Sequence, residues 1–268
     1  MKVAIIGGGN MGSTYAKAFV QSHMVEPHNI LIIEKHSEKK EELHKATSAI
    51  IADDLDDSIK SYDIIIIAVK PQDFRTLSLE LKKFLTPDHL VISIMAGITI
   101  ASIKELLQHE KVVRAMPNTP AQLGFGITAF TAAEGIPFDV ISQVDTLLET
   151  TGKAIFMKDE VLLDAVTALS GSGPAYFYYF VKHMIEAGKS MGMEEPVAGM
   201  LVRQTMLGAF QIMNNSKLTL DEMIKMVASK GGTTEAALNH FETNLVGETI
   251  IGALQAAQQR AQELSKTL

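Results

Sequence analysis

Short apolar runs alternate with amphipathic stretches along the first half of the chain. The runs consist mostly of Ile and Val, are too short for helices, and are bounded by polar or turn residues. Such runs indicate strands buried on both faces, expected here at residues 3–6, 30–33, 64–69, 90–94 and 112–115. The stretches between them have helical character, at residues 12–22, 38–45, 71–84 and 98–109. Strands that alternate with helices predict βαβ units and a parallel sheet with right-handed crossovers.

The pattern changes in the second half of the chain. Two further strands are expected at residues 124–131 and 154–157, with a helix at 137–150 between them. After Met157 the strand signal disappears, and the pattern is helical to the end with short breaks at 170–174, 192–196, 214–219 and 231–234. We therefore predict an α/β domain at residues 1–158, followed by an all-α domain at residues 159–268.

Composition narrows the class of protein. Of the 268 residues, 47% are hydrophobic and 21% are charged, which is typical of a soluble globular chain. The formal net charge of −7 argues against nucleic-acid binding, which needs a basic surface. Apolar runs such as 64–69 are far shorter than the roughly 20 residues that span a bilayer. We expect a soluble protein that binds neither nucleic acid nor a membrane.

Residue types that commonly hold metals are absent or scattered. The chain has no cysteine, which excludes disulfides, thiolate nucleophiles and cysteine-ligated metals and fits a cytoplasmic protein. The eight histidines never show the H-x-x-x-H spacing of a helical zinc site. We therefore expect no metal site.

A glycine-rich turn with the pattern G-x-G-x-x-G follows the first expected strand and opens a helix. Its first glycine permits the tight turn, its second lets a pyrophosphate approach the backbone, and its third allows close helix–strand contact. An ordinary glycine-rich turn is the alternative, but the flanking strand and helix favour a dinucleotide site at a helix N-terminus. The first domain is therefore expected to be a Rossmann-type doubly wound sheet. The residues expected to contact the cofactor here are Ile6, Gly7, Gly9, Asn10, Met11 and Gly12.

The end of the second strand bears on the choice of cofactor. Glu34 can accept hydrogen bonds from a ribose 2′-hydroxyl, which favours NADH, and its charge repels a 2′-phosphate. Lys35, Lys39 and Lys40 could instead hold that phosphate, although they are also expected to pair with acidic residues on a solvated helix face. Glu34 and Lys35 are both expected at the cofactor. We leave NADPH or NADH open and expect NADH to be used at least comparably to NADPH.

Six motifs occur in order along essentially the full chain: Gly-Gly-Gly-Asn-Met-Gly at 7–12, Ala-Val-Lys-Pro-Gln at 68–72, Ala-Gly-Ile-Thr at 96–99, Arg-Ala-Met-Pro-Asn-Thr-Pro at 114–120, Asp-Ala-Val-Thr-Ala-Leu-Ser-Gly-Ser-Gly-Pro-Ala-Tyr at 164–176 and Gly-Gly-Thr-Thr at 231–234. Together they resemble the pyrroline-5-carboxylate reductase family. The resemblance implies a Rossmann domain followed by a helical substrate-binding and dimerisation domain. It also implies an enzyme that reduces a cyclic imine carboxylate, 1-pyrroline-5-carboxylate, to L-proline with NAD(P)H. This is the last step of proline biosynthesis.

The resemblance also implies which residues form the site. It places two segments against the cofactor, and both lie at the carboxyl ends of expected strands, where an open α/β sheet binds its ligand. These residues are Ala68, Val69, Lys70, Pro71, Met95, Ala96 and Gly97. Around the substrate it places Glu160, Thr167, Ser229, Gly231, Gly232, Thr233 and Thr234. Pro174, at a helix start, offers a rigid apolar surface that could abut the nicotinamide.

Two parts of this site have a chemical interpretation. Hydride delivery to a protonated C=N bond needs little acid–base machinery, so we expect Thr167 to hydrogen-bond the imine nitrogen. A bond from Thr167 to its own backbone is the alternative. Gly231 and Gly232 expose N–H groups at a helix start, and with Thr233 and Thr234 they predict a site for the substrate carboxylate. An N-cap role for one of these threonines is the alternative.

Three residues depart from the family pattern: Glu34 replaces a small or basic residue, Lys230 replaces Pro, and Met226 replaces an Asn of some members.

Two other functions stay open. One is a different imine or β-hydroxyacid reductase of this architecture, although a hydroxyacid enzyme needs a Lys early in the helical domain, and the first there is Lys182. The other is a non-catalytic NAD(P)-binding regulatory module.

Wide apolar arcs at residues 197–213 and 244–257 predict a homodimer or larger homo-oligomer.

Overall fold

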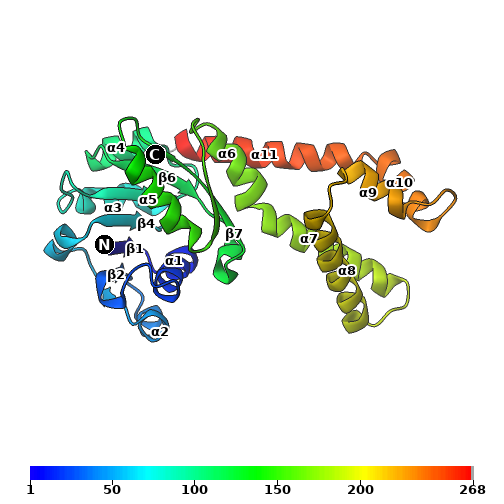
Figure 1. Ribbon diagram of the computed structural model, residues 1–268, viewed down its shortest axis with the longest axis horizontal. Coiled ribbons are helices and arrows are strands. Elements are labelled where there is room, and N and C mark those ends of the chain that lie inside the picture. Colours follow the sequence, from blue (N-terminus) through cyan, green and yellow to red (C-terminus); the bar gives the residue numbers. More distant parts are fainter. Residues whose placement is uncertain (267–268) are drawn as a thin grey trace. The chain divides into compact units, whose positions relative to one another are not determined.

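The computed structural model describes residues 1–266, and these divide into two compact units (Figure 1). The first unit contains residues 1–174 and takes up the chain again at Ala256, whereas the second contains Ala175–Gln255. Strands end at Phe156, close to the expected change from α/β to all-α structure. The division into a dinucleotide-binding domain at residues 1–158 and a substrate-binding and dimerisation domain at residues 159–268 stays a prediction.

An eight-stranded sheet forms the centre of the first unit, in the order β3-β2-β1-β4-β5-β6-β7-β8. All neighbouring strands are parallel except β6 and β7. The strands are β1 (Val3–Ile6), β2 (Ile30–Ile33), β3 (Ile50–Ala52), β4 (Ile64–Ile67), β5 (Leu90–Ser93), β6 (Val112–Met116), β7 (Gly126–Ala132) and β8 (Gly152–Phe156). The α/β fold with a Rossmann-type sheet is therefore confirmed.

The sheet differs from expectation at two strands. β3 is not predicted by the sequence pattern, because it has only three residues and lies at an edge with Ile50 exposed. β7 runs antiparallel to β6, whereas the sequence pattern predicts a parallel sheet. The connection at residues 117–125 explains the reversal, since a parallel crossover needs about a dozen residues or more.

Helices cover both faces of the sheet (Figure 1). Alternate residues of β1 belong to two separate cores. Val3 and Ile5 lie in the core that α1 (Asn10–Gln21), α2 (Ser37–Thr47) and α5 (Phe138–Glu149) cover. Ala4 and Ile6 lie in the core under α3 (Phe74–Leu81) and α4 (Ile100–Leu107). Chain connections from β1 and β4 thus leave in opposite directions, which opens a crevice at their carboxyl ends. Short 3₁₀ helices lie at Pro27–Asn29, Asp57–Ser61, Pro71–Asp73 and Thr119–Leu123.

The chain beyond β8 is helical, as predicted. It forms α6 (Leu162–Val166), a π-helical turn (Thr167–Gly171), α7 (Gly173–Ser190), α8 (Glu195–Asn215), α9 (Leu220–Val227), α10 (Thr233–Thr243) and α11 (Val246–Lys266). Many apolar side chains of α8 and α11 are exposed, including Met200, Leu207, Phe210 and Ile251. Within residues 1–266, no helix is long and apolar enough to cross a membrane.

Candidate functional site

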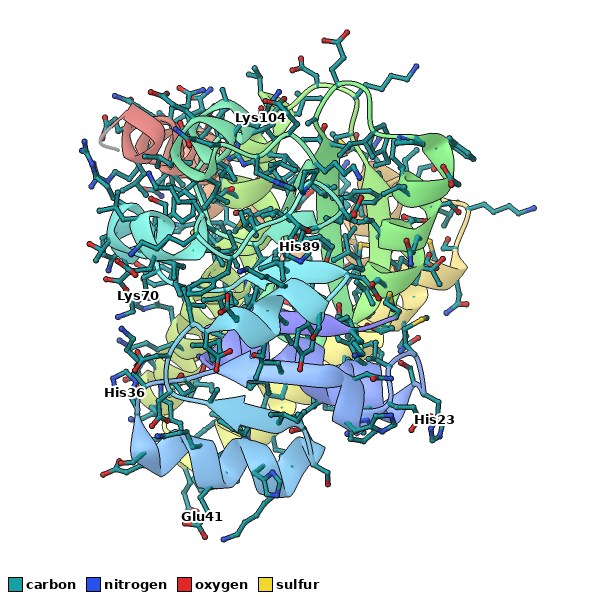
Figure 2. All side chains as sticks on the ribbon, turned by 90° about the vertical axis from the view of Figure 1, so that its left-hand side faces the viewer. His23, His36, Glu41, Lys70, His89 and Lys104 are labelled. Carbon is teal, nitrogen blue, oxygen red and sulfur yellow. The ribbon has the colours of Figure 1, made fainter. Side chains whose placement is uncertain are left out.

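A cavity of about 1040 Å³ lies in the first unit at the carboxyl ends of β1, β2 and β4. Figure 2 shows two of its lining residues, His36 and Lys70, on one edge of the unit, with His23 on the opposite edge. The cavity brings together eight of the residues predicted to bind the cofactor: Ile6, Gly7, Gly9, Glu34, Lys35, Ala68, Val69 and Lys70.

The glycine-rich turn is shaped for close approach of a ligand. Gly7 has a φ of +108°, and a Cβ atom there would lie 2.9 Å from the carbonyl oxygen of Ala68. A Cβ at Gly12 would lie 2.0 Å from the carbonyl oxygen of Gly7. Beside Gly9, in contrast, a Cβ would meet nothing within 4 Å, so the glycine leaves open space above the start of α1. Asn10 and Met11 form the first residues of that helix.

The N-terminus of α1 keeps its donors available. Its N-cap residue, Gly9, has no side chain to accept from the helix, and the first turn contains no acidic residue. Unpaired N–H groups and the helix dipole therefore favour an anion at this point. The open space at Gly9 fits the pyrophosphate of a dinucleotide.

Glu34 is a buried carboxylate at the rim of the cavity, with only 6% of its surface exposed. Its Oε1 accepts from the His36 backbone N–H at 2.9 Å and from His36 Nδ1 at 2.6 Å. Burial acts to raise the pKa of Glu34, but these hydrogen bonds and the nearby charge of Lys39 outweigh it and lower the pKa. Glu34 is thus ionised at neutral pH, and it offers acceptor oxygens and a negative charge to a ligand.

The lysines around Glu34 have different partners from those expected. Lys35 lies 3.9 Å from Asp54 in an exposed pair, and Lys40 pairs with Asp53 rather than with an acid of its own helix. Lys39 lines the cavity beside Glu34. Both charge signs therefore occur at the place where an adenosine ribose would bind.

The loop after β5 lies outside this cavity. Met95 is buried, and its N–H donates to Ser93 Oγ at 3.3 Å, whereas Gly97 has a φ of +75°. Ala96 lies half-buried between them, and Pro71 begins the 3₁₀ helix directly after Lys70. Contact of Met95, Ala96, Gly97 and Pro71 with the cofactor stays a prediction.

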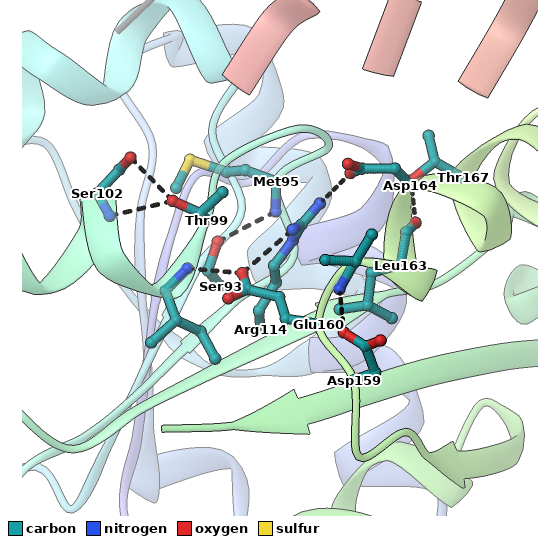
Figure 3. A network of polar contacts seen from close by, with 12 residues as sticks. Ser93, Met95, Thr99, Ser102, Arg114, Asp159, Glu160, Leu163, Asp164 and Thr167 are labelled. Carbon is teal, nitrogen blue, oxygen red and sulfur yellow. Dashed lines mark hydrogen bonds and ion pairs between the residues drawn. The ribbon is translucent and has the colours of Figure 1, made fainter. Parts of the chain in front are cut away.

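Three charged side chains meet beneath α6, in a network that Figure 3 shows. Arg114, on β6, has a side chain only 3% exposed; its Nη1 lies 3.1 Å from Glu160 Oε1 and its Nη2 lies 2.8 Å from Asp164 Oδ1. The same oxygen of Glu160 accepts from the Ile100 N–H at 2.7 Å. Glu160, predicted to bind substrate, therefore has one carboxylate oxygen occupied within the protein. Sequence reasoning assigned no role to Arg114 or Asp164, although an arginine inside an apolar strand was a signal.

Thr167 begins the π-helical turn that follows α6. Its Oγ1 donates to the carbonyl oxygen of Leu163 at 2.8 Å. This is the bond to the protein's own backbone that the sequence predicts as the alternative to an imine contact. The hydroxyl is half-buried and its oxygen can still accept a hydrogen bond. Pro174 lies in the first turn of α7, also half-buried.

In the second unit, a glycine turn leads into α10. Gly231 has a φ of +73°, and its N–H donates to Glu235 Oε2 at 2.7 Å. The Gly232 N–H donates to the carbonyl oxygen of Ser229 at 3.0 Å, and Gly232 is itself the N-cap. Neither threonine is therefore the cap, and Thr233 and Thr234 occupy the first turn of the helix. The two glycine N–H groups expected to bind the substrate carboxylate are thus both engaged within the protein, that of Gly231 by Glu235 and that of Gly232 by Ser229.

Residues 1–266 contain no group of three or more His, Asp or Glu side chains that could hold a metal ion.

Known proteins resemble this chain over its whole length. Residues 160–264 match a family model described as pyrroline-5-carboxylate reductase dimerisation, and residues 2–97 match one described as NADP oxidoreductase, coenzyme F420-dependent. The pyrroline-5-carboxylate reductase of Pseudomonas aeruginosa is 34% identical over 268 residues, covering 100% of this chain and 98% of that protein. The NADP-bound crystal structure of Plasmodium falciparum pyrroline carboxylate reductase has a TM-score of 0.89 at 26% identity, and covers 99% of this chain and 98% of that one. The structure of a pyrroline-5-carboxylate reductase from Coxiella burnetii has a TM-score of 0.87 at 31% identity, and covers 98% of each chain.

Proposed function

The chain belongs to the pyrroline-5-carboxylate reductase family, and from that membership we propose that it reduces 1-pyrroline-5-carboxylate to L-proline by hydride transfer from NADPH or NADH. The observation that carries the proposal is the crevice at the ends of β1, β2 and β4, where the glycine turn and Glu34 meet in one cavity. NAD(P)H bound there supplies the hydride. The reaction is the last step of proline biosynthesis.

The residues of the crevice hold the two ends of the cofactor's adenosine diphosphate. The N–H groups at the start of α1 bind the pyrophosphate above Gly9, because no side chain fills that space. Glu34 accepts hydrogen bonds from the ribose 2′-hydroxyl. Lys35 and Lys39 line the same cavity as Glu34, and they would offer positive charge to a 2′-phosphate.

Thr167 orients the imine. A protonated imine has an N–H to donate, and the Thr167 oxygen can accept because its own hydrogen is donated to the Leu163 carbonyl. The hydride adds to the imine carbon, the electron pair of the C=N bond moves to nitrogen, and the proton stays on the product amine. Glu160 and Pro174 belong to the same substrate region in this proposal.

The start of α10 holds the substrate carboxylate. Because the N–H groups of Gly231 and Gly232 are engaged by Glu235 and Ser229, the carboxylate is assigned in this proposal to the first turn of α10 that follows the glycines. Thr233 and Thr234 add hydroxyl donors in the first helical turn, and Ser229 lies directly before Lys230 and the glycines. This assignment rests on the family resemblance and on the helix N-terminus.

The protein acts in the cytoplasm as a homodimer or larger homo-oligomer. The dimerisation family model over residues 160–264 supports the assembly, and so do the exposed apolar side chains of α8 and α11. Sedimentation at micromolar concentration should give at least a dimer, and a monomer there would contradict this.

Spectrophotometric assay with the imine tests the function. Purified protein should oxidise NADPH or NADH only when 1-pyrroline-5-carboxylate is present, and L-proline should form in equal amount. If neither cofactor is oxidised although both bind, the chain is a cofactor-binding module and the proposed activity is wrong.

A further inference from the structure

The motif at residues 114–120 has no role in the function proposed above. Its first residue, Arg114, is nevertheless a buried cation that pairs with the carboxylates of Glu160 and Asp164. Arg114 lies in the middle of β6, whose residues 112–115 are all buried. A buried charge is tolerated where it is paired and hydrogen-bonded. Arg114 meets that requirement with two carboxylates from segments about fifty residues away in sequence.

One of the two contacts fixes the loop after β5. Glu160 Oε1 accepts both from Arg114 and from the N–H of Ile100, the first residue of α4. Earlier in the loop, the Met95 N–H is bound by Ser93 Oγ, and Ser93 pairs with Arg114 in the sheet. The loop that carries Met95 and Gly97 is therefore held at both ends by groups that adjoin Arg114.

The other contact fixes the segment that carries Thr167. Asp164 Oδ1 accepts from Arg114 Nη2 at 2.8 Å, and Thr167 follows three residues later, where the π-helical turn begins directly after α6. The hydroxyl of Thr167 is in turn bound by Leu163, the neighbour of Asp164. Figure 3 shows Arg114 between Glu160 and Asp164, with Thr167 at the end of this chain of contacts.

A second residue of the motif supports the π-helical turn from its other end. Asn118 Nδ2 donates to Ser170 Oγ at 3.2 Å, while Asn118 Oδ1 accepts from the Ile127 N–H at 3.0 Å. A Cβ at Gly171 would lie 2.4 Å from Met116 Cε, so the motif also contacts this turn through its methionine. The motif thus borders the Thr167 segment on two sides.

From these contacts we infer that Arg114 is a positioning residue, which sets the loop at 95–100 and the Thr167 turn at a fixed distance from each other. The planar guanidinium of Arg114 can hold both segments, because two of its nitrogens bind two carboxylates in a rigid geometry. The inference rests on the proposed function, in which this loop contacts the cofactor and Thr167 contacts the imine. Hydride transfer is sensitive to such spacing.

Three variants separate the two contacts. Glu160→Gln weakens the contact to the 95–100 loop, Asp164→Asn weakens the contact to the Thr167 turn, and Arg114→Met removes both. His109→Leu is the matched control, because it removes a buried hydrogen bond to the His89 carbonyl just before β5 and β6, at the opposite end of these strands.

Hydrogen–deuterium exchange tests the positioning without reference to catalysis. The amide of Ile100 should exchange at least tenfold faster in Glu160→Gln, and that of Ser172, which donates to the Thr167 carbonyl, should do so in Asp164→Asn. Both should accelerate in Arg114→Met, and neither in His109→Leu. If Arg114→Met does not fold, the two carboxylate variants decide the question. Unchanged exchange at both amides, or equal acceleration in the control, overturns the inference.

Kinetics test the consequence for the reaction. Asp164→Asn should lower kcat at least tenfold and change the KM for NADPH less than twofold, with a larger kinetic isotope effect from cofactor deuterated at the transferred hydrogen. A kcat within twofold of wild type, or a loss confined to KM, overturns the positioning role. If the wild-type protein does not reduce the imine, the proposed function fails, and the exchange experiment still decides whether Arg114 fixes the two segments.

Discussion

The hydroxyl of Thr167 has only its oxygen lone pairs left for a ligand, because its hydrogen is donated to the Leu163 carbonyl. This assignment narrows its proposed role to that of an acceptor for a protonated imine. A side chain that keeps the shape and removes the oxygen should therefore leave the fold intact and lose the orienting contact.

For Thr167→Val we expect kcat with the imine to fall about tenfold or more, roughly 1.4 kcal/mol in the activation barrier, since one hydrogen bond to a charged donor is lost. Steady-state assays with saturating NADPH measure this, and the thermal midpoint of unfolding serves as the control for folding. Activity within about threefold of wild type would mean that Thr167 has only its backbone role.

The charge of Glu34 gives a second prediction at this scale. The carboxylate is buried and ionised, so it should repel a 2′-phosphate and make NADH at least as good a substrate as NADPH. In Glu34→Ser, the ratio of kcat/KM for NADPH to that for NADH should rise at least tenfold. Glu38→Gln, which removes an exposed charge from the first turn of α2, is the control and should leave the ratio unchanged. A wild-type protein that strongly prefers NADPH would show that Lys35 or Lys39 overrides the repulsion.

At the scale of elements, the start of α10 combines a glycine turn with unpaired donors of a first helical turn. Substrate carboxylate bound there would contact Thr234, which is half-buried. Thr234→Ala should then raise the KM for the imine several-fold and leave the KM for the cofactor unchanged. Thr243→Ala, at the other end of the same helix, is the matched control. A raised cofactor KM, or an unchanged imine KM, would mean that the carboxylate binds elsewhere.

Elements differ in how far the sequence determines them. Five of the eight strands, β1, β2, β4, β5 and β6, follow from short runs rich in Ile and Val, because strands buried on both faces need continuous apolar residues. β7 and β8 are also predicted, although their sequences are not runs of this kind. β3 reads Ile-Ile-Ala and is also apolar, but a run of three residues at the edge of the sheet is too short to indicate a strand. The direction of β7 depends on the length of the connection before it, and not on its own residues.

The site shows the same limit. Glycines that need a positive φ or a close approach, such as Gly7, are fixed by local geometry and are recognisable in a sequence. The partners of Arg114 are not, because Glu160 and Asp164 meet it only after β6 and α6 have come together. In the sequence, Arg114 can be recognised only as a charged residue within an apolar strand, because its partners are distant along the chain.

For the whole molecule, two buried histidines predict how stability depends on pH. Burial, with the neighbouring His109, lowers the pKa of His89, and burial lowers the pKa of His109. His89 Nδ1 accepts from the Thr86 N–H, which requires the neutral ring. His109 Nε2 donates to the His89 carbonyl, which acts to raise the pKa of His109, but burial outweighs this bond. As the pH falls below about 6.5, the unfolded chain binds more protons than the folded protein, and the free energy of unfolding decreases.

Urea unfolding at pH 7.5 and pH 5.5 measures this loss. The wild-type protein should be less stable at pH 5.5, and His109→Gln should show a smaller difference between the two pH values. An equal difference in both proteins would assign the pH dependence to other groups.

The last helix, α11, contributes the segment that completes the first unit, and this segment is synthesised last. Residues 256–266 belong to the first unit, where Ala261 is only 3% exposed, although residues 175–255 separate them from the rest of that unit. During synthesis, the residues that form the sheet and the cofactor crevice therefore leave the ribosome before the segment that completes their unit has been made. A fragment that ends at Pro174 would leave the surface around Ala261 uncovered, and we expect it to be recovered from the insoluble fraction more often than the full chain.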